Sequence, residues 1–272
     1  MPEGPEVRRE ADQIGAVLAE REIEECFFGL ERLAHHAPTF QGVSVVEVTS
    51  RGKGMLIRFD NGLTLFTHNQ LYGKWMVRKR GQMPATGRSL RVALHTKTHS
   101  ALLYSASTIE VLDEVGLAEQ PFLSKLGPDV LDKDLHWRDV LTRLQDPKFR
   151  RRSVAALYLD QHFLAGLGNY LRSEIVHVAR VSPFVAPREL GRGQLGELAR
   201  ATLLLSQRAY ATAGVTNAPS RVKRLKSAGL KRREFRFAVF DRQHQPCYTC
   251  GAEIQRVEIS ARRLYYCPIC QA

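Results

Sequence analysis

Four of the five cysteines have the spacing of a metal site. They form two C-x2-C pairs separated by residues 251–266, namely Cys247, Cys250, Cys267 and Cys270. Each pair can present two thiolates to one ion, and two pairs complete a tetrahedron. Disulfides and a redox-active pair are the alternatives, but a thioredoxin-like site needs one C-x2-C at a helix start in a βαβ unit. We therefore predict one structural Zn²⁺ without an open coordination position. Cys26, beside Phe27 and Phe28, is predicted to be a core residue.

The charge of the chain indicates its partner. Its 272 residues include 40 Lys and Arg against 28 Asp and Glu, a formal net charge of +12. Basic residues gather at 148–152 and at 221–236, just before the cysteine hairpin. A solvated surface explains either run alone, but both together favour nucleic acid over an anionic membrane surface. With no run of 18 apolar residues and no signal-peptide pattern at the start, we predict a cytoplasmic protein.

The elements that must position these groups follow from the hydrophobic pattern. Residues 4–20 repeat apolar side chains at helical spacing, whereas about 22–112 is a series of short β-rich runs. Asn61-Gly62 between two of these runs predicts a tight hairpin. From about 135 the period is helical, and Gly127-Pro128 lies at the change. We predict an α+β protein of two domains: an N-terminal helix plus β-sandwich, then a helical domain with a C-terminal zinc-finger hairpin.

The predicted boundaries divide the chain into four segments. They are an N-terminal domain at 1–121, a hinge at 122–134, a helical domain at 135–234 and the zinc hairpin at 235–272. Within the helical domain we expect helices at 135–145, 152–161, 170–179 and 188–210, followed by a mobile basic loop at 213–234.

Several motifs occur together in one order along the whole chain. They are Met1-Pro2-Glu3-Gly4-Pro5-Glu6-Val7, Arg51-Gly52-Lys53-Gly54, Ala165-Gly166-Leu167-Gly168-Asn169-Tyr170, and the cysteine hairpin with Arg262. In this combination the chain resembles the formamidopyrimidine-DNA glycosylase/endonuclease VIII family of DNA repair enzymes. Residues 68–73 (HNQLYG) and 104–107 (YSAS) are similar to the bacterial endonuclease VIII branch, and the Arg-Arg-Phe-Gly stretch of the other branch is absent.

The resemblance implies a catalytic N-terminus in the first domain. Members of the family lose the initiator methionine and use the exposed proline as nucleophile, which here would be Pro2; with Met1 retained, its nitrogen is an amide and cannot react. Glu3 would be the catalytic acid, and Lys53 would contact phosphate and assist catalysis. The residues by themselves also allow a first-turn helix proline, a carboxylate favoured by a helix dipole, and a surface lysine.

The resemblance also implies how damaged duplex DNA is held. Asn169 of a helix–two-turn–helix and Arg262 of the zinc hairpin would bind phosphates, with the neighbouring Arg263 as a second candidate in the hairpin. A helix N-cap is the alternative role for Asn169. Gln70, Leu71 and Tyr72 would fill the gap left by a flipped-out lesion, although the triplet by itself favours ordinary strand-end packing. Supporting roles fall to Glu6 and to Glu174, which would bridge to the N-terminal site.

The function implied is base-excision repair by a bifunctional DNA glycosylase/AP lyase specific for oxidised pyrimidines. A preference for oxidised purines (formamidopyrimidine or 8-oxoguanine) and a catalytically silent DNA-binding relative are the alternatives. We expect a monomer with one Zn²⁺ that works on nucleoid DNA in the bacterial cytoplasm, without a membrane partner.

Overall fold

The computed structural model describes residues 2–272, which form two compact units. Unit 1 comprises Pro2 and Glu6–Lys125, and unit 2 comprises Glu3–Pro5 and Leu126–Ala272. The chain thus enters unit 2 briefly near its start and again after Lys125. The second crossing lies inside the segment predicted as a hinge, and the finer division into four segments stays a prediction. In residues 2–272, no helix combines the length and the apolar character needed to cross a bilayer.

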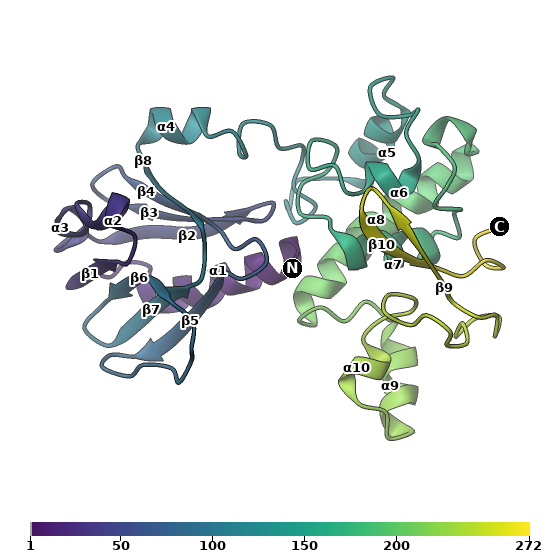
Figure 1. Ribbon diagram of the computed structural model, residues 1–272. Coiled ribbons are helices and arrows are strands. Elements are labelled where there is room, and N and C mark those ends of the chain that lie inside the picture. Colours follow the sequence, from purple (N-terminus) through teal and green to yellow (C-terminus); the bar gives the residue numbers. More distant parts are fainter. Residues whose placement is uncertain (1) are drawn as a thin grey trace. The chain divides into compact units, whose positions relative to one another are not determined.

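Unit 1 contains two four-stranded antiparallel sheets (Figure 1). The first has the order β2-β3-β4-β8, and the second has the order β1-β6-β7-β5. Their strands are β1 (Glu25–Phe28), β2 (Val45–Arg51), β3 (Gly54–Phe59), β4 (Thr64–His68), β5 (Lys74–Lys79), β6 (Leu90–His95), β7 (His99–Tyr104) and β8 (Thr108–Leu112). Short helices flank them at α2 (Glu31–Ala34), α3 (Ala37–Phe40) and α4 (Glu114–Glu119).

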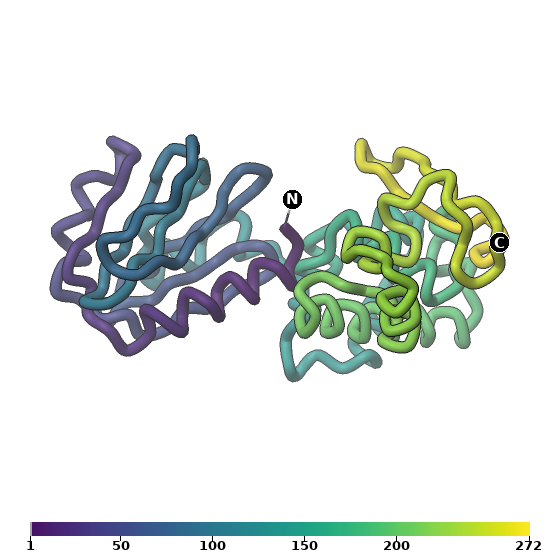
Figure 2. The backbone as a smooth tube through the Cα atoms, turned by 90° about the horizontal axis from the view of Figure 1, so that it is seen from below, coloured from purple at the N-terminus to yellow at the C-terminus, as the bar shows by residue number. Residues whose placement is uncertain are grey.

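The core of unit 1 combines both sheets with one face of α1 (Gly4–Leu18), which runs alongside the strands in Figure 2. The side chains of Val7, Ala11, Ile14 and Leu18 are at most 1% exposed. Their three- and four-residue spacing places them on one side of the helix. The predicted N-terminal helix and sandwich are therefore confirmed, and Cys26 packs partly buried against this core.

The predicted hairpin at Asn61-Gly62 joins β3 to β4. The N–H of Phe59 donates to the carbonyl of Leu63 at 2.9 Å, so the connection has three residues rather than two. Gly62 at its end has φ +81°, a left-handed conformation that glycine adopts without steric cost.

The core of unit 2 is helical. Its elements are α5 (Trp137–Gln145), α6 (Val154–Leu157), α7 (Asn169–Val178), a 3₁₀ turn at Pro187–Glu189 and α8 (Arg192–Ala211). Residues Tyr170–His177 of α7 are all buried, which makes this helix the centre of the unit. The helix predicted over 152–161 is shorter, because the Asp160 carboxylate accepts the N–H of His162 at 2.9 Å and turns the chain.

The segment after the crossing is bound into unit 2. The N–H of Gly127 donates to the carbonyl of Gln161 at 2.9 Å, and the N–H of Ala165 donates to that of Pro128 at 2.9 Å. A Cβ at Gly127 would lie 2.5 Å from the carbonyl oxygen of His162. The glycine therefore serves close backbone packing, and residues 127–130 are not a free linker.

The mobile loop predicted over 213–234 is wrong. The segment contains α9 (Pro219–Ser227) and α10 (Arg232–Phe235). Leu225 and Phe235 are buried together with Val215, and Val222 and Leu230 pack against them. The many cations concealed an amphipathic helix that begins with proline, a residue suited to the first helical turn. Further along the chain, β9 (Gln255–Ile259) and β10 (Arg262–Tyr266) pair as the hairpin predicted between the two cysteine pairs.

The packing of α9 predicts slow hydrogen exchange where a mobile loop would exchange fast. We expect the amides of residues 223–228 to be protected, and Leu225→Ala to reduce that protection by removing the buried side chain. Lys223→Ala, an exposed position on the same helix, is the control and should change little. Exchange measured by mass spectrometry checks this, and equally fast exchange in all three proteins would contradict the packed helix.

Candidate functional site

Lys53 lies on a two-residue turn between β2 and β3. Arg51 pairs with Gly54 across the turn, and Gly52 has φ +60°. A Cβ at Gly54 would lie 2.6 Å from the Phe66 ring. Both flanking glycines are therefore required by the backbone, one for its left-handed conformation and one for a close approach. The half-buried Lys53 lies near His68, whose pKa is lowered first by burial and then by the charge of this lysine.

Pro2 is half-buried and belongs to unit 1, as Lys53 does. The expected loss of Met1 concerns a residue outside the described range. Glu6, predicted as a supporting carboxylate, lies in the first turn of α1.

Glu3 is buried at the N-terminus of α7. Its Oε1 accepts the N–H of Tyr170 at 2.7 Å, and its Oε2 accepts the N–H of Leu171 at 3.2 Å. Such N–H groups have no partner within their own helix, and a negative charge there is favoured by the helix dipole. The carboxylate therefore caps a helix that is remote in sequence.

Three glycines make room for this cap. A Cβ at Gly168 would lie 2.4 Å from the Cδ of Glu3, and one at Gly4 would lie 2.9 Å from the Cα of Gly166. The N–H of Gly4 donates to the carbonyl of Gly166 at 2.8 Å, and Gly166 has φ +96°. The N-terminal motif and the glycine-rich turn are thus one packed structure.

Asn169 is the first residue of α7, and the N-cap position belongs to Gly168. The alternative N-cap role for Asn169 is therefore wrong. Its half-buried side chain accepts a hydrogen bond from Nη2 of Arg172 at 2.8 Å. This fixes the amide oxygen inward, so that an NH₂ group remains as donor.

Arg172 is a buried cation that the sequence analysis missed. Its guanidinium donates to the carbonyls of Ala155 at 3.0 Å, Arg263 at 3.0 Å and Arg262 at 3.3 Å. Burial lowers its pKa to about 10, while Glu3 raises it and Arg262 lowers it. Arg172 thus ties the tip of the zinc hairpin to α7. Little in the sequence signalled this burial, because α7 also contains Ser173, Glu174 and His177, and such a mixture suggests a solvent-exposed face.

Arg262 is exposed at the first position of β10 and pairs with Ile259. Between them, Ser260 and Ala261 have φ +56° and +54°, the double left-handed conformation of a tight hairpin turn. The backbone of Arg262 is held by Arg172, whereas its side chain extends from the turn. Neighbouring Arg263 is exposed as well.

Glu174 does not make the expected bridge to the N-terminal site. Its Oε1 accepts the N–H groups of Val239 at 2.8 Å and Phe240 at 2.9 Å. Its Oε2 accepts the N–H of Ala238 at 2.8 Å and the hydroxyl of Thr216 at 2.5 Å. A fully buried carboxylate needs such a set of donors, and this one secures the chain that leads to the zinc hairpin.

Gln70, Leu71 and Tyr72 lie in the connection from β4 to β5. Leu71 is 56% exposed and Tyr72 is 70% exposed. Strand-end packing therefore does not account for either side chain. The side chain of Gln70 is fixed by two hydrogen bonds. Its Nε2 donates to the hydroxyl of Thr108 at 2.9 Å, and its Oε1 accepts from the hydroxyl of Ser107 at 3.1 Å.

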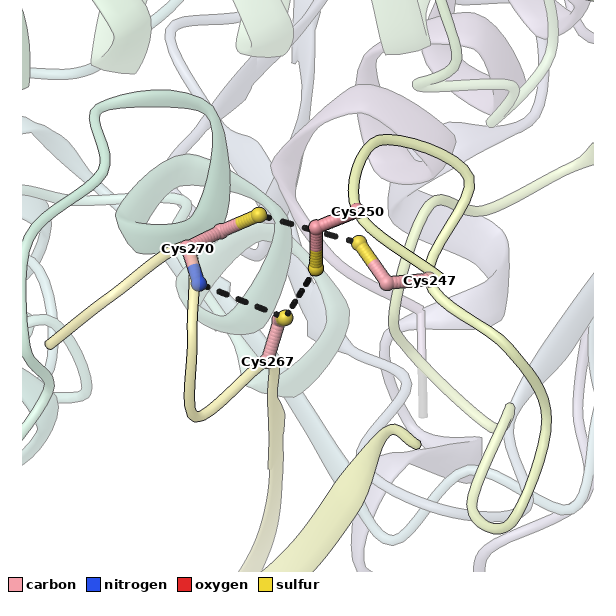
Figure 3. Close-up of side chains that lie close together, drawn as sticks. All are labelled: Cys247, Cys250, Cys267 and Cys270. Carbon is pink, nitrogen blue, oxygen red and sulfur yellow. Dashed lines mark hydrogen bonds between the residues drawn. The ribbon is translucent and has the colours of Figure 1, made fainter. Parts of the chain in front are cut away.

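The four cysteine sulfurs converge, as Figure 3 shows, and all lie within 4.8 Å of one another. Sγ of Cys250 is 3.4 Å from that of Cys267, and Sγ of Cys247 is 3.9 Å from that of Cys270. A disulfide requires about 2.05 Å, whereas a Zn–S bond of about 2.3 Å gives tetrahedral edges near 3.8 Å. The N–H groups of Thr249 and Cys270 lie 3.4 Å from Sγ atoms, as suits thiolates. The donor set fits Zn²⁺.

Cys26 is separate from this group, and burial raises the pKa of its thiol to about 12. A thiol held in its neutral form is neither a metal ligand nor a nucleophile.

Known proteins resemble this chain over its full length. The sequence pattern of the formamidopyrimidine-DNA glycosylase N-terminal domain matches residues 1–107. The chain is 44% identical to a protein named Endonuclease 8 from Escherichia coli and 42% identical to one from Salmonella arizonae. Both matches extend over 271 residues and 100% of either chain.

Solved structures share the fold. One is a complex of Lactococcus lactis Fpg (MutM) with DNA containing N7-benzyl-Fapy-dG, with a TM-score of 0.81 and 19% identity. Another is Lactococcus lactis Fpg with DNA containing an abasic site, with a TM-score of 0.80 and 20% identity. Each match covers 99% of both chains.

The cap on α7 predicts the stability of three variants. Glu3→Ala should lower the free energy of unfolding by about 1–3 kcal/mol, because two buried N–H groups lose their acceptor. Glu3→Gln should cost less, since its amide oxygen still accepts one of them. Gly168→Ala should resemble Glu3→Ala by displacing the carboxylate. Urea unfolding checks these values against Glu24→Ala, an exposed control; equal stability of all four variants would refute the cap.

The cysteine cluster predicts one bound zinc per chain, measured by elemental analysis of the purified protein. Cys267→Ser should lose the metal because it removes a thiolate ligand. Cys26→Ser, which changes a cysteine outside the cluster, should retain it, and full zinc content in Cys267→Ser would show that the cluster is not the site.

Proposed function

This chain belongs to the formamidopyrimidine-DNA glycosylase/endonuclease VIII family, and we propose that it removes oxidised pyrimidines from DNA with Pro2 as nucleophile. The family consists of DNA glycosylase/AP lyases of base-excision repair. The observation that carries the choice of substrate is the 44% identity over the full length to a protein named Endonuclease 8.

The chemistry requires Pro2 to have a free secondary amine. An α-amino group titrates near neutrality, so a fraction of it is uncharged and nucleophilic at physiological pH. Its nitrogen attacks C1′ of the lesion, the glycosidic C–N bond breaks, and the base leaves with a proton. The amine then loses its proton, the C1′–O4′ bond of the sugar breaks with O4′ taking up a proton, and C1′ becomes the carbon of an iminium. This iminium acidifies the C2′ proton, whose removal expels the 3′ phosphate; a second elimination expels the 5′ phosphate.

Glu3 is proposed as the acid that protonates the opening deoxyribose or the departing base. Its two backbone donors hold the carboxylate in one orientation, which is the precondition for directed proton transfer. Because it follows Pro2 directly, the same cap also restrains the nucleophile.

Phosphate binding is proposed for Lys53, Asn169 and Arg262. The amides of Tyr170 and Leu171 at the start of α7 already bind Glu3, so they are not available to a phosphate. Side chains must therefore supply the donors in unit 2, and Asn169 and Arg262 are both oriented through Arg172. A bound Zn²⁺ would act mechanically, by holding the hairpin that carries Arg262.

Gln70, Leu71 and Tyr72 are proposed as the wedge that replaces the flipped-out nucleotide, with Leu71 filling space, Tyr72 stacking and Gln70 facing the orphaned base. We further propose that the protein acts as a monomer on nucleoid DNA in the bacterial cytoplasm.

Borohydride trapping on a thymine-glycol duplex tests the nucleophile. Protein with Met1 removed should give a covalent adduct, because borohydride reduces the iminium to a stable amine. Pro2→Gly should weaken the adduct, and Lys53→Ala should slow its formation. DNA binding without any adduct would instead support the catalytically silent alternative. Faster excision from an 8-oxoguanine duplex than from the thymine-glycol duplex would support the purine alternative.

Arg262 should contribute one phosphate contact. With about six contacts, the log–log dependence of the binding constant on salt should have a slope of about −5. Arg262→Ala should reduce that slope by about one and lower excision with the fold intact. Arg256→Ala, an exposed arginine on β9, is the matched control. Identical slopes for both variants would remove Arg262 from the DNA interface.

A further inference from the structure

One carboxylate binds both ends of the wedge loop, residues 69–75. Oε2 of Glu10, on α1, accepts a hydrogen bond from Nδ2 of Asn69 at 2.6 Å. Its Oε1 accepts the N–H of Trp75 at 3.0 Å. Asn69 directly follows β4 and Trp75 lies in β5, so a single side chain bridges the strand ends between which the loop projects.

The loop between these ends is fixed by polar contacts. The N–H of Gly73 donates to the carbonyl of Asn69 at 2.7 Å, and Nη1 of Arg88 donates to that of Tyr72 at 2.5 Å. Gln70 has φ +47°, an uncommon conformation for a residue with a side chain. A Cβ at Gly73 would lie 2.6 Å from the Cα of Asn69. The backbone is thus closed tightly at its base.

The tip of the loop lacks packing of its own. Leu71 and Tyr72 are mostly exposed, so they lose little freedom through burial and contribute little hydrophobic stabilisation to the loop. Its conformation must therefore come from polar contacts, namely those of Glu10 at its base, that of Arg88 with Tyr72 and those of the Gln70 side chain. A wedge that is ordered before it meets DNA avoids an entropic cost on insertion.

We propose that Glu10 is a positioning residue for the wedge, which holds loop 69–75 in the conformation that inserts into duplex DNA. The inference rests on the proposed wedge role of Leu71 and Tyr72. Glu10 itself touches neither DNA nor the reacting atoms; it acts through Asn69 and Trp75.

The surroundings of Glu10 strengthen these contacts. Burial raises its pKa, against the opposing effects of the Trp75 N–H, the Asn69 amide and the charge of Lys74. Hydrogen bonds to a carboxylate that is shielded from water are stronger than exposed ones. The Oδ1 atom of Asn69 is buried and has no hydrogen-bond partner among the described residues. A flip of the Asn69 side chain would turn this Oδ1 atom toward position 10. In a Glu10→Gln variant, the new amide NH₂ group could then donate a hydrogen bond to it.

The first test compares Glu10→Ala with Glu10→Gln in the full-length zinc-bound protein. Glu10→Ala removes both acceptors and should slow excision from a thymine-glycol duplex by about tenfold or more. AP lyase activity on a single-stranded oligonucleotide with an abasic site should stay unchanged, since no stack has to be opened. Glu10→Gln should restore duplex activity, with its oxygen accepting from Trp75 and its amide donating to Asn69.

An exchange of the two groups gives a sharper control. Asn69→Asp places two carboxylates in contact and should lower duplex activity. Combining Asn69→Asp with Glu10→Gln exchanges the carboxylate and the amide, and should recover activity that Asn69→Asp alone loses. Fluorescence of 2-aminopurine beside the lesion should report base unstacking on binding in the same order of variants. A purely structural loss would lower thermal stability and both activities together.

Two results would overturn the inference. One is that Glu10→Ala excises from duplex DNA as fast as the wild type. The other is that the double variant Glu10→Ala/Leu71→Ala loses as much duplex activity as the two single losses combined, whereas the inference predicts that Glu10→Ala has little further effect once Leu71 is removed. Failure of the proposed function has a different signature, namely no borohydride adduct with the wild-type protein. The 2-aminopurine signal would still report in that case whether Glu10 positions the wedge.

Discussion

The buried carboxylate of Glu3 on the N-terminus of α7 is the interaction on which the rest of the site depends. A helix end inside a protein has unpaired N–H groups that must find an acceptor, and a charged side chain without donors is costly to bury. The N–H groups at the start of α7 donate to the carboxylate of Glu3, so both groups are satisfied, provided that the two backbones can approach each other. Gly4, Gly166 and Gly168 permit that approach, which explains the glycine of the N-terminal motif and the two glycines of a turn far from it in sequence.

Helix α7 extends this arrangement to the zinc hairpin. Its buried face carries Arg172, which binds the carbonyls at the hairpin tip, and Glu174, which binds the amides of the chain leading to the hairpin. Most of their hydrogen bonds go to backbone groups, with the Asn169 amide and the Thr216 hydroxyl as the side-chain partners, so both residues fix the position of the chain around α7. Glu3 at the start of α7 and Arg262 on the hairpin are thereby both attached to the same helix. The cysteine cluster joins the two ends of the hairpin.

The net charge of +12 is used in several different ways. Arg172 is fully buried, Arg236 lies 4.5 Å from the ring of Phe237, and Arg232 binds the carbonyl of Ala213. These cations stabilise unit 2. Lys53 and Arg262 lie on tight turns, and they are the cations for which we propose phosphate binding. Composition alone reports the sum of these roles, and only the local surroundings distinguish a cation that supports the fold from one that meets DNA.

Residue types and short spacings determined much of this protein. The C-x2-C pairs implied a four-thiolate cluster, the apolar repeats predicted α1 and the sandwich, and the order of motifs identified the family. These features depend on neighbours within a few residues. The partners of polar side chains do not: Glu3 meets Tyr170 across 167 positions, and Glu10 meets Asn69 across 59. Periodicity contains no information on such pairs. Helix α9 was not predicted within its run of cations, because its few apolar residues form a core only when Val215 and Phe235 pack against them. The tertiary structure alone decided these contacts, because a buried polar group selects its partner from whatever the folded chain brings within hydrogen-bond distance.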